Sequence, residues 1–347
     1  MPLPMRRLGR SGPEITRLGL GSYAIGGEGW ANAWGPQDDD AAIAALRHGV
    51  ERGINWIDTA AIYGAGHSEE LVGRLLRALP AERRPLVFTK CGLRWDPANP
   101  LKPAWRDLTR RSIREECEAS LRRLGVETID VYQFHRPDSD TGTPVEESWD
   151  EMGRLIDEGK VRWGGVSNFD VALLERCERI RHVDSFQPPL SLIRREWADT
   201  AIPWCERNGT GVIGYSPMHA GLLTDRFSRE RVRSLPANDW RSRSADFTSP
   251  KLERNLALRD ALRPVAARHR TTVASIAIAW ALHWPGVTAS IVGARAPEQV
   301  DGWIDAASVV LDASDLAEIE RAVESSGAGS GPVRPGASSA VKLSARS

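Results

Sequence analysis

The sequence has few cysteines, no excess of charge and no long apolar run, and each of these absences excludes a class of protein. Its four cysteines stand far apart in 347 residues, without a CxxC pair and without histidines at the spacing of metal ligands. This distribution argues against a disulfide framework and against structural zinc, and it is typical of a reducing compartment. We therefore expect free thiols and no bound metal ion.

Net charge and hydropathy exclude further classes of protein. Basic and acidic residues number 46 each, so the formal net charge is zero. The chain therefore has no basic field that would attract nucleic acid. The first residues lack the apolar stretch of a secretory signal, and no later run reaches membrane-spanning length. These features predict a cytoplasmic protein that contacts neither nucleic acid nor membrane.

What the sequence does have is a repeated alternation of short apolar strands and amphipathic helices. Residues 5 to 22 carry four glycines between short apolar runs, which favours a small hairpin followed by a first core strand, LGLGSY. Helical spacing runs from Asp38 to the glycine stop at Gly53. Further strands are expected over 54–58, 86–90, 129–135, 161–166, 184–187, 211–215 and 289–293. Further helices are expected over 69–79, 108–125, 145–158, 170–180, 196–208, 252–270, 272–284, 297–304 and 314–325.

This order predicts a single α/β domain over residues 1–325. Eight strands that are separated by helices or long loops fit a closed (β/α)8 TIM barrel, preceded here by a short N-terminal β-hairpin. A doubly wound open sheet is the alternative, but no GxGxxG motif opens any strand-to-helix turn. Residues 326–347 are rich in Gly, Ser and Ala without periodicity, so we expect a flexible C-terminal tail.

Polar residues occupy the expected carboxyl ends of these strands, where barrels keep their chemistry. Asp58, Lys90 and His135 each end a strand, and Tyr63 follows Asp58 in a Gly-rich turn. Alone, each has an ordinary structural explanation: a rim ion pair, a packed loop aromatic, or a strand-end histidine. The remaining strand ends carry further candidates: Ser167, Asn168, Gln187, Tyr215 and Arg295. Together these residues predict one polar rim around one mouth of the barrel.

The chemistry open to this set is specific. A tyrosine has an ordinary pKa of about 10, which a neighbouring ammonium lowers, and a carboxylate holds that ammonium in place. Asp58 and Lys90 could therefore make Tyr63 a usable proton donor, while His135 orients a carbonyl oxygen. No activated serine or cysteine nucleophile is present. The set can protonate a carbonyl, and it requires a cofactor that supplies hydride.

Aromatic residues add a candidate substrate pocket. Most of the thirteen tryptophans are expected in the core or under helices. Four others lie in loops that the barrel would bring to the same mouth: Trp30, Trp34, Trp95 and Trp105. They either pack there or line a substrate pocket.

The motifs that carry these residues resemble the aldo-keto reductase family from about residue 5 to residue 325. They stand in family order as Asp58 to Gly64 (DTAAIYG), Lys90, His135 in HRPD, Gly165 to Asn168 (GVSN), Gly214 to Pro217 (GYSP) with Gly221 to Leu223, and Gly293 to Arg295 with Gln299. The resemblance implies that Tyr63 is the general acid, Lys90 and Asp58 its tuning partners, and His135 the donor that orients the carbonyl.

The resemblance also implies a nicotinamide cofactor. Ser167, Asn168 and Gln187 would bind its carboxamide, and Tyr215 would stack on the ring. The pyrophosphate would lie on Ser216, Met218, Gly221 and Leu222, and the final nucleotide-binding stretch would comprise Gly293, Arg295 and Gln299. A guanidinium at Arg295 suits a 2′-phosphate, which favours NADPH over NADH. Trp303 stands where many relatives carry an asparagine for the adenine, and His219 and Ala220 are also unusual. These departures predict either an adenine stacked on an aromatic ring or a pocket built differently.

We therefore expect NADPH-dependent reduction of a small aldehyde or ketone to an alcohol, with the reverse oxidation open. The alternative is a non-catalytic NADPH-binding redox sensor that acts through a protein partner. A barrel hydrolase is disfavoured, because the strand ends offer one central acid instead of two facing ones. Substrate identity and oligomeric state are left open by the sequence.

Overall fold

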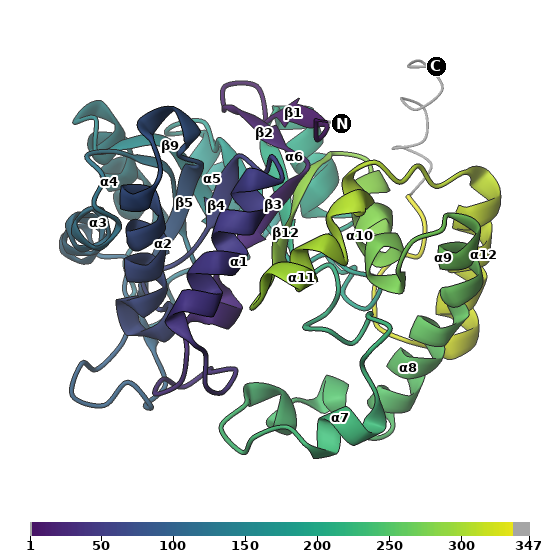
Figure 1. Ribbon diagram of the computed structural model, residues 1–347. Coiled ribbons are helices and arrows are strands. Elements are labelled where there is room, and N and C mark those ends of the chain that lie inside the picture. Colours follow the sequence, from purple (N-terminus) through teal and green to yellow (C-terminus); the bar gives the residue numbers. More distant parts are fainter. Residues whose placement is uncertain (1, 336–347) are drawn as a thin grey trace.

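The computed structural model describes residues 2–335, and within them eight parallel strands close into a barrel (Figure 1). The ring runs in chain order through β3 (Leu18–Gly21), β4 (Trp56–Asp58), β5 (Leu86–Cys91), β8 (Ile129–Phe134), β9 (Val161–Ser167), β10 (Ser185–Gln187), β11 (Gly211–Tyr215) and β12 (Val287–Gly293). Parallel pairing of β12 with β3 closes it, with Gly293 opposite Gly21. The expected (β/α)8 TIM barrel is confirmed.

Helices surround the strands. They are α1 (Asp39–Glu51), α2 (His67–Ala78), α3 (Arg110–Leu124), α4 (Val145–Asp157), α5 (Val171–Glu178), α6 (Ala201–Asn208), α7 (Arg229–Arg233), α8 (Lys251–Ala261), α9 (Arg263–Arg268), α10 (Val273–His283), α11 (Pro297–Asp301) and α12 (Ala313–Ser326). Side-chain caps begin several of them: Asp38 accepts from the Ala41 amide and Asp170 from that of Leu173. None of the helices in residues 2–335 combines the length and apolar character needed to cross a membrane.

Two helices differ from the expected ones because of proline. The helix expected over 252–270 is divided at Leu262 into α8 and α9, and Pro264 lies in the first turn of α9. The helix expected from residue 196 begins only at Ala201, and Pro203 lies in its first turn. Proline has no N–H and clashes with the carbonyl four residues earlier, so it is tolerated only in a first turn. In both cases the helix therefore begins shortly before the proline.

The N-terminal hairpin covers the end of the barrel where the strands begin. Its strands, β1 (Met5–Arg7) and β2 (Glu14–Thr16), pair antiparallel, as expected. Leu8 and Ile15 are fully buried and pack with Trp56, Phe88 and other residues of the barrel interior. The hairpin therefore lies across the end of the barrel opposite the carboxyl ends of the strands (Figure 1).

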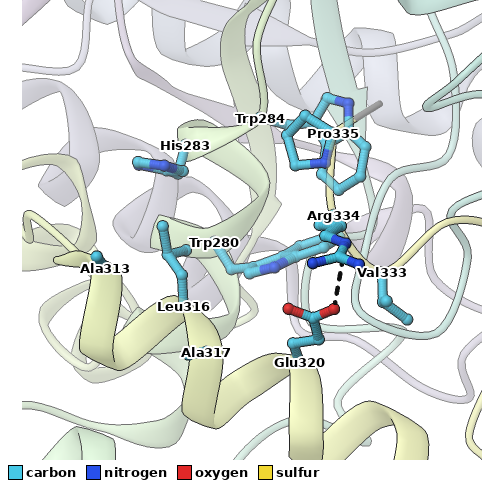
Figure 2. A pocket seen from close by; sticks show the side chains of 10 residues that line it. All are labelled: Trp280, His283, Trp284, Ala313, Leu316, Ala317, Glu320, Val333, Arg334 and Pro335. Atoms are coloured by element: carbon cyan, nitrogen blue, oxygen red, sulfur yellow. Dashed lines mark ion pairs between the residues drawn. The ribbon is translucent and has the colours of Figure 1, made fainter. Parts of the chain in front are cut away.

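The segment after α12 packs against the barrel as far as it is described. Ser330 pairs with Arg194, and the buried Arg195 donates to the carbonyls of Ala328 and Gly331. A cavity of about 240 Å³ lies between this segment, α10 and α12, and Arg334 at its edge forms a 3.4 Å ion pair with Glu320 (Figure 2). Residues 336–347 of the expected flexible tail lie outside the described residues, and for them flexibility stays a prediction.

Candidate active site

The carboxyl ends of β4 and β5 bring a buried ion pair into the barrel mouth. Lys90 Nζ lies 2.5 Å from Asp58 Oδ1 and donates to the Thr59 carbonyl over 2.8 Å. Both charged side chains are almost fully buried. Burial raises the pKa of Asp58 and lowers that of Lys90, while each partner opposes the shift of the other. Each charge therefore depends on the other for its ionised state.

Tyr63 follows β4 in a tight turn whose next three residues, Gly64 to Gly66, all have positive φ, and Gly64 has no room for a side chain. Gly64 and Gly66 have positive φ angles of 63° and 103°, and a Cβ at Gly64 would collide with the carbonyl oxygen of Gly26. The turn places the Tyr63 ring 4.9 Å from the Tyr23 ring, and Lys90 Nζ lies 5.3 Å from the Tyr63 centroid. Within the described chain the Tyr63 hydroxyl has no hydrogen-bond partner. Its oxygen is not fully buried, so the missing partner leaves no occluded polar atom. The hydroxyl is therefore free to donate, although the ring is buried.

The expected lowering of the Tyr63 pKa is wrong for this structure. Burial raises the pKa of Tyr63 well above its ordinary value, and the negative charge of Asp58 raises it further. Desolvation is the largest cause because the ring is packed among other aromatic side chains, and the positive charge of Arg136 offsets only part of the rise. The phenol is consequently protonated at neutral pH, which is the form that a proton donor requires.

His135 ends the strand next to Lys90. Its ring lies 5.6 Å from that of Tyr63, and its backbone N–H donates to the Cys91 carbonyl. Burial, followed by the charges of Lys90 and Arg136, lowers the pKa of His135 well below its ordinary value. The imidazole is therefore neutral. No ring nitrogen of His135 is hydrogen-bonded to any residue between 2 and 335, so the ring can donate one hydrogen bond to a ligand.

The residues expected near a nicotinamide carboxamide also come together. The Tyr215 hydroxyl donates to Asn168 Oδ1 over 3.0 Å, and Asn168 Nδ2 donates to the His135 carbonyl over 3.1 Å. Ser167 Oγ donates to the Gln187 carbonyl over 2.7 Å. These bonds link the ends of four strands, so the carboxamide side of the candidate site adjoins His135.

The turn after β11 is suited to bind an anion through its backbone. Ser216, His219, Ala220 and Gly221 all have positive φ, and the amides of Met218 and Ala220 donate to no acceptor within residues 2–335. Unpaired amides in such a turn form an anion-binding concavity. This geometry fits a cofactor pyrophosphate.

Two side chains near this turn have structural roles. The Leu222 side chain is fully buried in the core, and its backbone amide donates to the His219 carbonyl. Neither the side chain nor the amide of Leu222 is therefore free for the expected pyrophosphate contact. The His219 ring bonds Asp246 over 3.0 Å and stacks on Phe247. His219 therefore anchors the loop.

Arg295 lies at the expected nucleotide end, just after Gly293. Its amide donates to Gln299 Oε1 over 2.8 Å, and its guanidinium binds the Gln37 side chain and the carbonyls of Trp34 and Pro36. No carboxylate pairs with it in the described chain. Trp303 is buried in the core, so the structure gives no support to adenine stacking on that ring.

The four loop tryptophans separate into different environments. Trp30 is buried, and its ring lies 6.3 Å from that of Tyr63; Trp95 packs against the same cluster. Trp34 lies 4.2 Å beneath the Arg241 guanidinium, where the loop of residues 216–250 meets the loop of residues 28–37. Trp105 is exposed on β7 (Trp105–Arg106), which pairs with β6 (Leu93–Arg94). Trp30 and Trp95 are therefore beside the candidate proton donor, and Trp105 is outside that cluster.

Two residues of the site were not predicted from the sequence. Tyr23 contacts the Tyr63 ring, and Gln133 reaches Asp58 from inside the barrel. Strand alternation offered a signal for Gln133, because it lies two residues before His135 and so faces the same side of its strand. Tyr23 had no comparable signal, since its position depends on how a loop folds.

Comparisons with known proteins agree with this geometry. Residues 17–324 match the model of the aldo/keto reductase family. The chain is 33% identical to the aldo-keto reductase YhdN of Bacillus subtilis, covering 90% of this chain and 92% of that one. It is also 33% identical to the NADH-specific methylglyoxal reductase of Escherichia coli, covering 91% and 98%. The solved structure of a glycerol dehydrogenase from Gluconobacter oxydans superposes with a TM-score of 0.83 at 35% identity, covering 94% and 97%. The chain therefore belongs to the aldo/keto reductase family, whose members are NAD(P)H-dependent oxidoreductases.

Proposed function

We propose that the protein reduces a small aldehyde or ketone to its alcohol, with NADPH as the preferred cofactor and Tyr63 as the general acid. The observation that carries this proposal is a protonated, unengaged phenol beside a neutral, unengaged imidazole, next to the Asp58–Lys90 ion pair. Two free donors near one point suit a carbonyl oxygen, which accepts two hydrogen bonds.

The residues then have distinct tasks. His135 donates to the carbonyl oxygen and orients it, and Tyr63 donates its proton to the same oxygen as negative charge develops there. The ammonium of Lys90 stabilises the resulting phenolate, and Asp58 holds the ammonium charged. A bound nicotinamide supplies the hydride. Tyr63 is restored when a proton returns from solvent.

The NADPH preference rests on Arg295. Burial lowers the pKa of Arg295, and the positive charges of Arg241 and Arg231 lower it further, while Asp239 opposes the shift. No carboxylate of residues 2–335 forms an ion pair with this guanidinium, so a 2′-phosphate would be its direct anionic partner. The relative from Escherichia coli is named NADH-specific, so the two cofactors have to be compared directly.

Replacing Arg295 by alanine is expected to weaken NADPH binding about tenfold or more and to change NADH binding much less, because one charge-assisted contact to phosphate contributes roughly 1.5–3 kcal/mol. Quenching of intrinsic fluorescence by each cofactor measures both affinities. Arg111→Ala serves as the control, because it removes an exposed guanidinium on α3 that pairs only with Glu115 and lies outside the candidate site. Equal losses for both cofactors in Arg295→Ala would contradict the phosphate contact.

Trp30 and Trp105 form a matched pair for the substrate pocket. Because Trp30 packs beside Tyr63 and Trp105 is exposed outside that cluster, Trp30→Phe is expected to raise KM for an aromatic aldehyde several-fold, whereas Trp105→Phe leaves it unchanged. Steady-state kinetics with benzaldehyde and propanal checks this. A larger effect from Trp105 would place the pocket elsewhere on the loops.

The function itself is tested by following NADPH oxidation with a panel of carbonyl compounds. Methylglyoxal and glyceraldehyde belong in the panel because relatives are named for methylglyoxal reduction and glycerol oxidation. Aromatic and longer aliphatic aldehydes complete it. Tight NADPH binding without turnover of any carbonyl would contradict the proposal and would favour a redox sensor instead.

A further inference from the structure

A network of buried amides lies behind the ion pair, inside the barrel. Gln187 Nε2 donates to Asp58 Oδ2 over 2.8 Å and to Gln133 Oε1 over 3.2 Å. Gln133 Nε2 lies 3.4 Å from the same Asp58 oxygen, and Ser185 Oγ lies 3.4 Å from Gln133 Oε1. All four side chains are buried, so water does not compete for these bonds.

Only one orientation of the two amides satisfies this network. A carboxylate oxygen only accepts, so Nε2 of both glutamines must face Asp58. The second hydrogen of Gln187 Nε2 then requires the oxygen of Gln133. Gln187 Oε1 accepts no hydrogen bond from residues 2–335. This oxygen is not fully buried, so a ligand can reach it. An accessible amide oxygen at this position suits an N–H donor such as the carboxamide of a nicotinamide.

The neighbouring strand provides the space for Gln133. In the parallel register Gln133 lies opposite Gly165, and Gly165 lies opposite Ser185. A Cβ at Gly165 would come within 2.9 Å of Gln133 Cγ and would also overlap Ser185 Oγ. Glycine inside a strand often marks such a close approach. An alanine at position 165 would displace both side chains of the network.

We propose that Gln133 is a positioning residue that directs the Gln187 oxygen toward the cofactor and holds the carboxylate of Asp58 in place beside Lys90. The inference rests on the proposed function, because it assigns the Gln187 oxygen to a nicotinamide carboxamide. Two titratable groups interact with the Asp58 charge: Lys90 lowers the pKa of Asp58, and Asp58 raises the pKa of Tyr63. Gln133 carries no charge, so it acts by orientation and by a hydrogen bond to the ionised form of Asp58.

Gln133→Met tests this role, because methionine matches the length of glutamine and removes its amide. Turnover is expected to fall about tenfold, since one hydrogen bond to a charged group is lost. NADPH affinity should fall in parallel, because Gln187 is no longer aligned. The acid limb of the kcat/KM profile should move to higher pH, since Asp58 loses a donor that stabilises its anion.

Tyr132→Phe is the matched control. Tyr132 belongs to the same strand and is equally buried, and its hydroxyl interacts with Cys91 and with no residue of the amide network. Its side chain packs with the core outside the strand ring, so its removal should leave turnover, affinity and pH profile unchanged. Gln133→Asn is a second variant should the methionine variant fail to fold; it keeps an amide but withdraws it from Asp58, and the same losses are expected.

A folded Gln133 variant with wild-type turnover, pH profile and NADPH affinity would overturn the inference. The affinity measurement separates this failure from failure of the proposed function. If the wild type bound NADPH without reducing any carbonyl, the proposed function would fail. The comparison of NADPH affinities would still decide whether Gln133 aligns Gln187.

Discussion

Tyr63→Phe is expected to lower carbonyl reduction by roughly 10²–10⁴-fold, the usual contribution of a positioned general acid. The phenyl ring fills the same space against Tyr23, Trp30 and His135, so packing is preserved. The lost hydroxyl has no partner in the described residues, so no buried polar group is orphaned. The variant should therefore fold and bind NADPH as the wild type does.

The measurement is NADPH oxidation by wild type and variant with the same aldehyde, together with NADPH binding followed by fluorescence. Unchanged binding with lost turnover assigns the proton-donor role to Tyr63. Retained turnover would refute that role and would direct attention to His135, the other donor beside the carbonyl position.

Lys90→Met is expected to have the second largest effect, on stability as well as on activity. It leaves the Asp58 carboxylate buried without its counter-charge, which typically costs 3–5 kcal/mol when one partner of a buried pair is removed. Chemical denaturation measures the loss in free energy of unfolding. Lys102→Met is the surface control: its 3.0 Å ion pair with Asp96 is largely solvated, so a change of no more than about 1 kcal/mol is expected.

The loss in Lys90→Met should depend on pH in a defined direction. Lys90 opposes the rise in the Asp58 pKa, so its removal raises that pKa further above the value in the unfolded chain. A group whose pKa is raised by folding stabilises the folded state at low pH and loses that contribution as pH rises. The destabilisation should therefore shrink toward acidic pH. A loss that grew on acidification would show that the buried carboxylate is not its source.

Combining Lys90→Met with Asp58→Asn should recover part of this stability, because the pair is then replaced by two uncharged groups. The double-mutant cycle measures the coupling between them. Turnover should not recover, since the ammonium that stabilises the phenolate is still missing.

The repeat of strands and helices could be predicted from the sequence because each unit is encoded locally, by apolar periodicity and by glycine and proline stops. The strand-end residues Asp58, Lys90 and His135 followed from this, since parallel strands in a barrel deliver their carboxyl ends to one mouth. Where a prediction over-extended a helix, as before Pro203, a local rule on proline explains the difference.

Tertiary structure alone determined where the side chains of the long loops lie. Trp30 lies beside Tyr63 and Trp105 does not, although the sequence gives the two no distinguishing signal. Trp303 and Leu222 turned out to be core residues. Loop side chains are placed by contacts with segments far away in the chain, so local patterns carry little information about them.

The electrostatics of the site were also decided by the tertiary structure. From the sequence a lysine near Tyr63 implied a lowered pKa, but burial of the ring raises it. Residue types determine which charges and donors are present, whereas burial determines their free energies, because desolvation depends on every neighbour at once. The sequence by itself thus determined the barrel, the family and the set of polar residues at its mouth. Only packing in three dimensions decided which of them are protonated, free to donate, or held by Gln133 and Gln187.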